Sequence, residues 1–378
     1  MARICIGIED VNRKGGQERV ICELLWRLAE RHEVDLICFG AEEIPPNVRV
    51  LRVRDPGRFS LLLRAFWFIP FASRLAARER YDAVVSQGTN LWNQTHVIAH
   101  TCQAQRSHNR RTVQWKQSPP SLPKRAEFAI RDRILLWLER RMTRRCRGRI
   151  IAVGDDPKRN LVEFHGLNES DVTVAYNGVD HAVFRPELRD EWRPKLRSEV
   201  GLSDSTFVAL FLGSRWEEKG LRWVIEALPH VQHPDFRLVL VGSGDQQVWG
   251  SLAERLGVKE KVVFAGRREN PERWYAMADC FAFLSETEGL ALVTLEAAAS
   301  GLPLILAEGH AAPGLLDDGI SGFAAPYDPP AIAAKLDALA GNPDFCRRAG
   351  QASHERSLRF SWDRQAREIE AFVLGTGG

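Results

Sequence analysis

Residues 280–297 read Cys280-Phe-Ala-Phe-Leu-Ser-Glu-Thr-Glu-Gly-Leu-Ala-Leu-Val-Thr-Leu-Glu-Ala297, an apolar run, a short polar loop and a second apolar run. The first run predicts a buried strand, Cys280–Leu284, and the second predicts a helix that begins near Ala291. A strand, a glycine-containing loop and a helix in this order are the unit from which parallel sheets with helical cover are built. The stretch therefore predicts an α/β fold.

The same alternation runs along the whole chain. Short β-branched runs alternate with longer amphipathic stretches such as Gln17–Glu30, the pattern of parallel strands buried on both faces. Each half of the chain therefore predicts its own Rossmann-like, doubly wound unit. The predicted strands are Arg3–Ile8, Val34–Phe39, Ala83–Ser86, Thr95–His100 and Ile150–Val153, then Phe207–Gly213, Arg237–Val241, Val262–Ala265, Cys280–Leu284 and Pro303–Ala307.

The chain is long enough for two such units, because 378 residues are two to three times the common length of one domain. The turn signal Asn177-Gly178 follows a predicted strand and marks the boundary between them. Two units facing one another would form a cleft at the carboxyl ends of both sheets, where ligands of open α/β sheets bind.

Composition excludes several classes of protein. The apolar runs are too short or too interrupted to span a membrane, and the N-terminus reads as a first strand, without the pattern of a secretory leader. The seven cysteines are never spaced as CxxC, which favours a reducing cytosol over a disulfide framework or a zinc knuckle. We therefore expect a cytoplasmic protein.

Residues 106–149 carry a strong local charge excess, 14 Lys and Arg against three acids, or +11. The other residues sum to −8, so the net charge of +3 hides an asymmetry. Trp115, Phe128 and Trp137 lie within the segment, and basic residues mixed with aromatic ones suit an anionic lipid surface. A solvated basic helix around Arg140–Arg149 is the alternative. No nucleic-acid-binding motif is present, so we expect a membrane surface as partner and no nucleic acid.

The loop Asn12–Arg19 follows the first predicted strand and opens a helix. Gly15 and Gly16 have no Cβ, so backbone there can approach a phosphate or sugar, and the helix N-terminus supplies free N–H donors. A plain tight turn between strand and helix is the more common role of such a pair.

The loop Gly213–Gly220 follows the first strand of the second half. Arg215 and Lys219 within it could bind a diphosphate, Arg through its fork of donors and Lys as a mobile point charge. A solvated pair at the start of a helix is the alternative.

Glu288 and Glu296 stand eight residues apart in the opening stretch. Carboxylates suit vicinal hydroxyls, because each accepts two hydrogen bonds at once. Glu296 lies among apolar neighbours, where an unpartnered carboxylate is costly, so a functional role is favoured over a solvated face. The backbone N–H groups of Gly289 to Val293 would suit an anionic leaving group.

His100 ends a predicted strand and could project toward a ligand at the carboxyl end of the sheet. A lone histidine is more often structural, so both interpretations stay open. The other histidines show no HExxH or paired spacing, and we predict no metal site.

Together these segments resemble the retaining GT-B glycosyltransferases of family four, the glycosyl transferases group 1. The first half, with its strand end Ser86-Gln-Gly88, is most similar to transferases of bacterial lipopolysaccharide core assembly. The resemblance rests on the GGxER loop at Gly15–Arg19, Asn177-Gly-Val-Asp180 and Phe184-Arg-Pro186 in the connector, the loop Gly213–Gly220, the E-x7-E spacing of Glu288 and Glu296, and Phe360-Ser-Trp362 before the last helix.

The resemblance implies two Rossmann-like domains facing across a cleft. Residues 1–177 would form the acceptor-side domain, to which a last helix at 363–378 would cross back. Residues 178–362 would form the domain that binds the nucleotide-sugar donor.

The resemblance also implies roles for single residues. Lys219 would neutralise the donor diphosphate, Glu296 would bind the nucleotide ribose, Glu288 would bind donor-sugar hydroxyls, and His100 would touch the donor sugar. Further donor contacts are implied for Gly15, Gly16, Gly213, Gly289, Leu290, Ala291, Leu292 and Arg267.

One position departs from the family pattern. Many members have arginine directly after the glycine of the phosphate loop, whereas Ser214 stands there and Arg215 follows. Either Arg215 substitutes with a shifted backbone, or Lys219 carries the charge with help from elsewhere.

The implied activity is transfer of a sugar from a UDP-, GDP- or ADP-linked donor to a hydroxyl of a glycan or glycolipid, with retention and without metal or cofactor. The implied setting is synthesis of lipopolysaccharide or another cell-envelope polysaccharide at the inner face of the cytoplasmic membrane. Two alternatives stay open: an isomerase or hydrolase of the UDP-sugar 2-epimerase type on the same fold, and a non-catalytic nucleotide-sugar-binding module.

Overall fold

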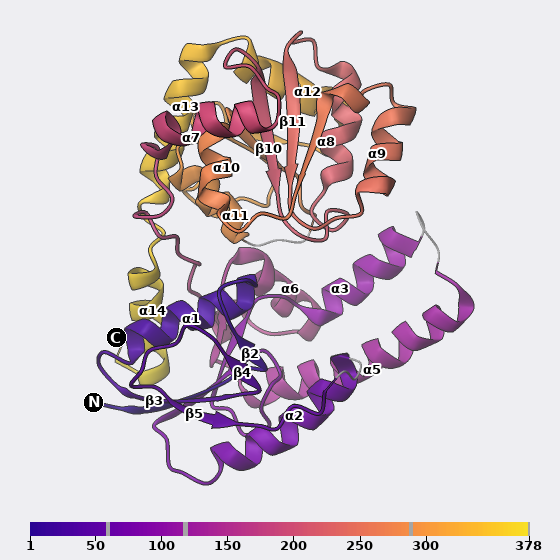
Figure 1. Cartoon of the computed structure of the whole chain (residues 1–378). Helices are drawn as coiled ribbons and strands as arrows, with labels where there is room; N and C mark the ends of the chain where they lie inside the picture. Colours follow the sequence, from indigo (N-terminus) through magenta and orange to yellow (C-terminus); the bar gives the residue numbers. More distant parts are fainter. Residues whose placement is uncertain (58–60, 116–119, 287–289, 377–378) are drawn as a thin grey trace. The chain divides into compact units, whose positions relative to one another are not determined.

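The computed structural model describes residues 1–57, 61–115, 120–286 and 290–376. Its internal contacts divide the chain into two compact units (Figure 1). The first unit comprises Met1–Asn177 and Trp362–Gly378, and the second comprises Gly178–Ser361.

The first unit is built on a seven-stranded sheet in the order β5-β3-β1-β6-β7-β8-β9, with every neighbouring pair parallel. The five strands predicted for the first half of the chain, from Arg3–Ile8 to Ile150–Val153, are confirmed. Their observed ends differ from the predicted ones by no more than two residues. The strands are β1 (Arg3–Gly7), β3 (Glu33–Cys38), β5 (Arg49–Arg52), β6 (Ala83–Gln87), β7 (His96–Ala99), β8 (Ile150–Ala152) and β9 (Val172–Val174), and the two-residue strands β2 (Asp10–Val11) and β4 (Gly40–Ala41) pair separately.

Helices cover both faces of this sheet. Ile4 and Ile6 of β1 pack in one core cluster with α1 and the C-terminal helix α14, whereas Cys5 between them packs in another with α2. Alternate residues of one strand thus enter two cores, as in a buried parallel sheet. The helices are α1 (Gly16–Leu28), α2 (Leu61–Ala76), α3 (Gln103–Asn109), α5 (Leu122–Arg145), α6 (Asp155–His165) and α14 (Trp362–Leu374).

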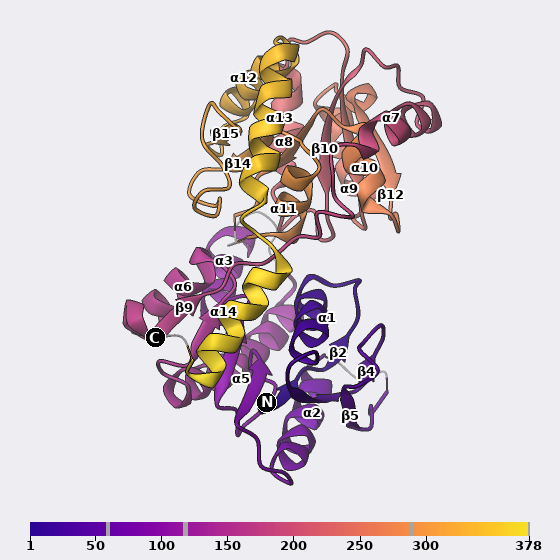
Figure 2. The same ribbon diagram turned by 90° about the vertical axis from the view of Figure 1, so that its left-hand side faces the viewer.

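The last helix, α14, belongs to the first unit (Figure 2). It packs beside α1, where Glu370 accepts hydrogen bonds from Arg31 at 2.5 Å and pairs with Nε2 of His32 at 2.8 Å. Nε2 of Gln365 donates to the carbonyl of Ala175. The predicted return of the C-terminal helix to the first domain is confirmed.

The second unit has a six-stranded parallel sheet in the order β12-β11-β10-β13-β14-β15. The five predicted strands are confirmed here as well. The strands are β10 (Phe207–Leu212), β11 (Phe236–Val241), β12 (Val262–Gly266), β13 (Cys280–Phe283), β14 (Leu304–Ala307) and β15 (Gly322–Ala325). The helices are α7 (Leu188–Glu199), α8 (Leu221–Ala227), α9 (Gln246–Arg255), α10 (Pro271–Met277), α11 (Leu292–Ala299), α12 (Pro329–Ala340) and α13 (Pro343–Ser357).

Each sheet has a point at which the strand order reverses. In the first sheet the chain moves from β1 outward to β3 and β5, then continues on the other side of β1 with β6. In the second it moves from β10 to β11 and β12, then returns beside β10 with β13. The loops that follow β1 and β6, and those that follow β10 and β13, diverge at these points, where ligands of such sheets bind.

Within the described residues, no helix combines the length and the hydropathy needed to cross a bilayer.

Candidate functional site

The loop after β10 folds around a buried tryptophan. Trp216 is 1% exposed, and its indole N–H donates to the carbonyl of Gly213 at 2.8 Å. At the other end of the loop, Gly220 has φ +75°, and a Cβ there would lie 1.9 Å from the carbonyl oxygen of Leu284. Only glycine fits this approach, which holds Lys219 beside the end of β13.

Arg215 and Lys219 both lie in this loop but in different settings. Arg215 is exposed, adopts the left-handed conformation with φ +54° and pairs with Glu218 at 3.0 Å. A non-glycine residue in this region is uncommon, so the loop geometry imposes it. Lys219 is half-buried. The predicted pair therefore lies together at the reversal point of the second sheet, with Arg215 turned to Glu218.

The carboxylate of Glu296 has a partner that the sequence pattern did not indicate. Glu296 is buried in α11, and its Oε2 accepts the hydroxyl proton of Tyr275 at 2.9 Å. Tyr275, from α10, has no exposed surface. On sequence Tyr275 resembles an ordinary core aromatic, because it stands between Trp274 and the apolar Ala276 and Met277, and nothing local indicates the contact.

The loop between β13 and α11 is tied to its surroundings through Ser285 and Glu286. The Ser285 hydroxyl donates to the carbonyl of Glu218 at 3.3 Å, and Tyr327 donates its hydroxyl proton to the carbonyl of Ser285 at 3.1 Å. The indole N–H of Trp223 donates to Oε1 of Glu286 at 3.1 Å. These contacts join the loops after β10 and β13 on neighbouring strands.

Glu288 and Gly289 lie outside the described residues. Leu290 and Ala291 are buried, and α11 begins at Leu292. Ala291 occupies the N-cap and offers no side-chain acceptor to the first turn. Helix N-terminal N–H groups without a side-chain cap favour an anion.

The two arginines that follow β12, Arg267 and Arg268, differ in their contacts. Arg268 donates to the carbonyl of Ala265 at 2.9 Å, stacks over the ring of Trp274 at 5.0 Å and pairs with Glu199 at 3.1 Å. Arg267 is exposed. Arg268 is exposed as well, but these three contacts hold its side chain in place.

The first unit contains a hollow of about 470 Å³ at its own reversal point, lined by residues that follow β1, β6 and β7. Gly15 caps α1, which begins at Gly16. Oδ1 of Asn12 accepts the backbone N–H groups of Lys14 and Gly15 at 2.8 and 3.3 Å and so shapes the turn. The glycine pair thus stands at a strand-to-helix turn on the side of this hollow.

His100 follows β7 and lines the hollow. Its Nε2 atom is enclosed and has no hydrogen-bond partner among the described residues. Burial lowers the pKa of His100 to about 3, so the imidazole is neutral near pH 7.

Three buried or half-buried side chains, Cys102, Glu139 and His165, place their ligand atoms within 4.8 Å of one another. The Glu139 carboxylate accepts the N–H groups of Gln103 and Ala104 at 2.6 and 3.0 Å and contacts Nε2 of His165 at 2.8 Å. Through these bonds Glu139 caps the first turn of α3.

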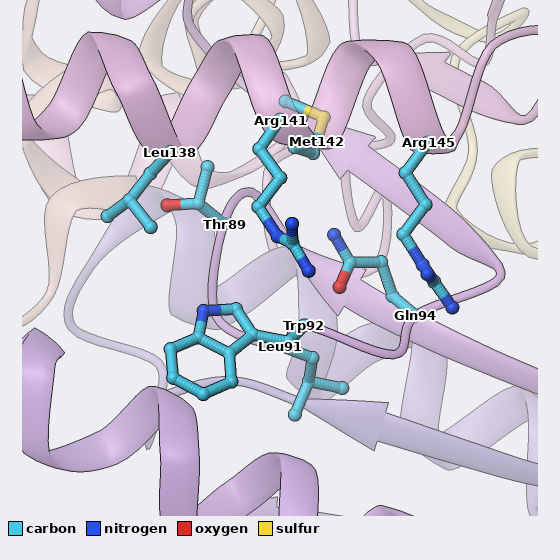
Figure 3. A pocket seen from close by; sticks show the side chains of 8 residues that line it. All are labelled: Thr89, Leu91, Trp92, Gln94, Leu138, Arg141, Met142 and Arg145. Atoms are coloured by element: carbon cyan, nitrogen blue, oxygen red, sulfur yellow. The ribbon is translucent and has the colours of Figure 1, made fainter.

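A much smaller hollow lies between α5 and the loop after β6, where Arg141 and Arg145 extend from the helix toward Gln94 and Trp92 (Figure 3). Its volume of about 10 Å³ has room for little more than a water molecule. Arg141 and Arg145 of α5 therefore lie against residues of the first unit, next to Trp92 and Gln94.

Comparison with known proteins places both units in one group. Residues 14–183 match the model for Glycosyltransferase Family 4, and residues 206–342 match that for Glycosyl transferases group 1. The chain is 28% identical over 225 residues to an uncharacterized glycosyltransferase of Methanocaldococcus jannaschii, covering 58% of each. It is 30% identical over 233 residues to a D-inositol 3-phosphate glycosyltransferase of Streptomyces bingchenggensis, covering 58% of this chain and 50% of that one. The matched region thus spans 50–58% of the length of these two relatives.

Solved structures with the same architecture include WaaG, a glycosyltransferase involved in lipopolysaccharide biosynthesis, with a TM-score of 0.78 at 17% identity over 99% of this chain and all of that one. Sucrose-phosphate synthase from Thermosynechococcus elongatus gives 0.79 at 18% identity over 100% and 99%. The Anabaena protein HepE, solved with UDP and glucose, gives 0.73 at 19% identity over 99% and 100%. The fold is GT-B.

Proposed function

Because this chain belongs to the group 1 glycosyltransferases, we propose that it transfers a sugar from a nucleotide-diphosphate sugar to a hydroxyl of a glycan or glycolipid. The observation that carries the proposal is the reversal point of the second sheet. There the Lys219 loop, the uncapped start of α11 and the buried Glu296 stand on adjacent strands and helices. A cation, N–H donors and a carboxylate are the groups that a diphosphate and a ribose require.

In the proposed mechanism the second unit holds the donor. Lys219 neutralises the diphosphate, with the first N–H groups of α11 as further donors to its oxygens. Glu296, oriented by Tyr275, accepts hydrogen bonds from the ribose hydroxyls. These groups are held in place by buried contacts before the donor arrives, so the charge that develops on the leaving phosphate meets a preorganised environment.

The proposal includes retention of configuration. As the bond between the anomeric carbon of the sugar and the phosphate oxygen breaks, Lys219 would stabilise the negative charge that develops on that oxygen. The acceptor hydroxyl oxygen would bond to the anomeric carbon from the face that the phosphate leaves, and its proton would pass to the leaving phosphate oxygen. The donor chemistry proposed here uses no metal and no cofactor.

The proposal extends to a cell-envelope acceptor reached at a membrane surface, with the protein in the cytoplasm. The helix α5 supports this, because it exposes Leu122, Ile130 and Trp137 at 78%, 63% and 57% among many basic residues. Exposed apolar side chains on a basic helix suit the interface of an anionic bilayer, where each Lys or Arg contributes about 1 kcal/mol.

Two other functions would use the same donor site. An isomerase or hydrolase of the UDP-sugar 2-epimerase type would convert the nucleotide sugar without any acceptor. A binding module would hold the nucleotide without converting the sugar. Product analysis with and without acceptor separates all three.

The experiment incubates the full chain with a panel of nucleotide sugars and extracted bacterial glycolipids, and follows acceptor mass. The proposal predicts a gain of one hexose or heptose, and Lys219→Ala reduces turnover at least ~100-fold, as loss of one preorganised contact does. Lys195→Ala is the control, because Lys195 is an exposed lysine of the same unit that pairs with Glu191. Conversion of the donor without acceptor supports the isomerase or hydrolase, and turnover unchanged in Lys219→Ala contradicts the assigned site.

A further inference from the structure

We infer that the hollow of the first unit receives an uncharged or amino-bearing sugar and rejects a phosphorylated one. This inference rests on the proposed function, since it concerns the acceptor of the same reaction. It also separates this chain from a relative named for D-inositol 3-phosphate, whose acceptor carries a phosphate.

The position of the hollow identifies it as a ligand site. It lies where the strand order reverses between β1 and β6, and the loops after β1, β6 and β7 form its walls. A volume of about 470 Å³ lies within the range of small-molecule sites.

Its walls hold two enclosed polar atoms that find no partner in the described part of the chain. Gln87 is 6% exposed, and its Oε1 is enclosed without a hydrogen bond among the described residues. The Nε2 atom of the neutral His100 is also enclosed and has no hydrogen bond to a described residue. Buried polar atoms of this kind are rare unless something outside the chain pairs with them, and hydroxyl groups of a sugar can do so.

The charge of the hollow is negative. Four carboxylates line it, from Glu9, Asp10, Glu18 and Glu139, against the single guanidinium of Arg64. Arg64 is partly engaged, because its Nη2 donates to Asp10 at 3.1 Å and to Asp55 at 3.2 Å, whereas its enclosed Nε has no hydrogen-bond partner among the described residues. A phosphate entering here would meet four like charges, and it would have to compete with Asp10 and Asp55 for the one guanidinium among the described lining residues.

We expect Glu9 to favour ligands with an ammonium or hydroxyl group over ligands with a phosphate. It lies two residues after the end of β1, is half-buried, and has no ion pair in the described part of the chain. Burial, together with the charges of Asp10 and Glu18, raises the pKa of its carboxyl group despite Arg64. An ammonium or hydroxyl donor on the ligand would relieve this cost, whereas a phosphate would add to it.

The test measures binding of three sugars of one ring size and different charge: methyl glucoside, glucosamine and glucose 6-phosphate. Saturation-transfer NMR on the full chain is expected to detect the first two, with glucose 6-phosphate at least ~10-fold weaker, since like-charge juxtaposition costs several kcal/mol. Added salt should reduce the difference in affinity between glucose 6-phosphate and the other two sugars, because it screens the carboxylates.

Glu9→Gln should reduce the preference for glucosamine over methyl glucoside and raise the affinity for glucose 6-phosphate. Glu30→Gln, an exposed position outside the hollow, should change neither. Glucose 6-phosphate binding as tightly as methyl glucoside overturns the inference, and so does the failure of all three sugars to bind. Titration of UDP, GDP and ADP into the same sample reports the donor site separately, so the proposed function can stand when this inference fails.

Discussion

At the scale of single residues, the candidate site depends on pairs that join distant parts of the chain. Glu296 could be singled out from sequence, because a carboxylate in an apolar helix is costly without a function or a partner. Its partner Tyr275 could not, since 21 positions and a strand separate the two. Trp216 illustrates the same limit, because its role in shaping the loop after β10 arises only when the indole packs beneath that loop.

Tyr275→Phe tests the pair directly. Loss of a hydrogen bond to a charged group costs about 1.5–3 kcal/mol, so the affinity for the best-binding nucleoside diphosphate should fall by about tenfold or more. Titration calorimetry on the full chain measures this. Tyr81→Phe removes a comparable tyrosine–carboxylate bond, to Asp35 in the first unit, and should leave that affinity unchanged.

His100 should make the protein sensitive to acid. In the folded chain its pKa is lowered from 6.5 to about 3, so below pH 6.5 the unfolded chain takes up a proton that the folded chain does not. The free energy of unfolding therefore falls as pH drops from 6.5 toward 3. His100→Asn should lose less melting temperature between pH 7 and pH 4 than the wild type, and an equal loss would contradict the assigned pKa.

At the scale of elements, long apolar strands could be predicted and marginal ones could not. Ten strands could be predicted from their apolar runs, among them β10 and β13, which carry the candidate site. The edge strands β5 and β15 gave no such signal, because one begins and ends with arginine and the other is a short Gly-Phe-Ala-Ala run. Gly322 of β15 needs a φ of +146° and lies against Leu304 of β14, so this strand forms through a tertiary contact.

Gly220→Ala tests the close approach between the loop after β10 and the end of β13. Gly257→Ala is its control, because that glycine also has a left-handed φ of +70° but no heavy atom within 4 Å of the added Cβ. Each alanine should lower the free energy of unfolding by about 1 kcal/mol, because it has to adopt the left-handed backbone conformation of the glycine. Only Gly220→Ala should displace Leu284 and weaken nucleoside diphosphate binding, and equal binding by the two variants would show that this contact does not shape the site.

Asp279 ties α7 to the second sheet. It accepts hydrogen bonds from Arg189 and Arg197 and from the N–H of Val208, and pairs with Arg193 at 2.8 Å. Burial raises the pKa of its carboxyl group, but the three guanidinium groups outweigh it and lower the pKa overall.

Asp279→Asn should therefore lower the free energy of unfolding by about 3–5 kcal/mol, as removal of one partner from a buried ion pair does. Chemical denaturation followed by tryptophan fluorescence measures it. Asp344→Asn breaks an exposed pair with Arg347 in the same unit and should have a much smaller effect. Similar losses in the two variants would contradict the structural role of Asp279.

At the scale of the whole molecule, the net charge of +3 divides into a segment of +11 and a remainder of −8. The structure places most of that basic segment on α3 and α5 of the first unit, with Arg133, Arg140 and Arg144 exposed. The acidic hollow of the same unit could not be foreseen, because its carboxylates come from three segments, Glu9-Asp10, Glu18 and Glu139, that only the fold brings together.

Membrane attachment is the prediction that belongs to this scale. The protein should sediment with vesicles containing phosphatidylglycerol and release them as salt rises, because screening weakens attraction to an anionic surface. Replacing Arg133, Arg140 and Arg144 with glutamine should weaken this binding. Equal binding to neutral vesicles would refute an electrostatic attachment.

The central claim is that the second unit binds a nucleotide-sugar donor where β10 and β13 meet. Calorimetric titration of UDP, GDP and ADP into the full chain tests it most directly, with Lys219→Ala, Glu296→Ala and the control Lys195→Ala beside the wild type. The account predicts that at least one diphosphate binds the wild type and the control alike, and binds both site variants at least ~10-fold more weakly, as loss of a charged contact implies. Binding that both site variants retain in full, or no binding of any diphosphate, would contradict it.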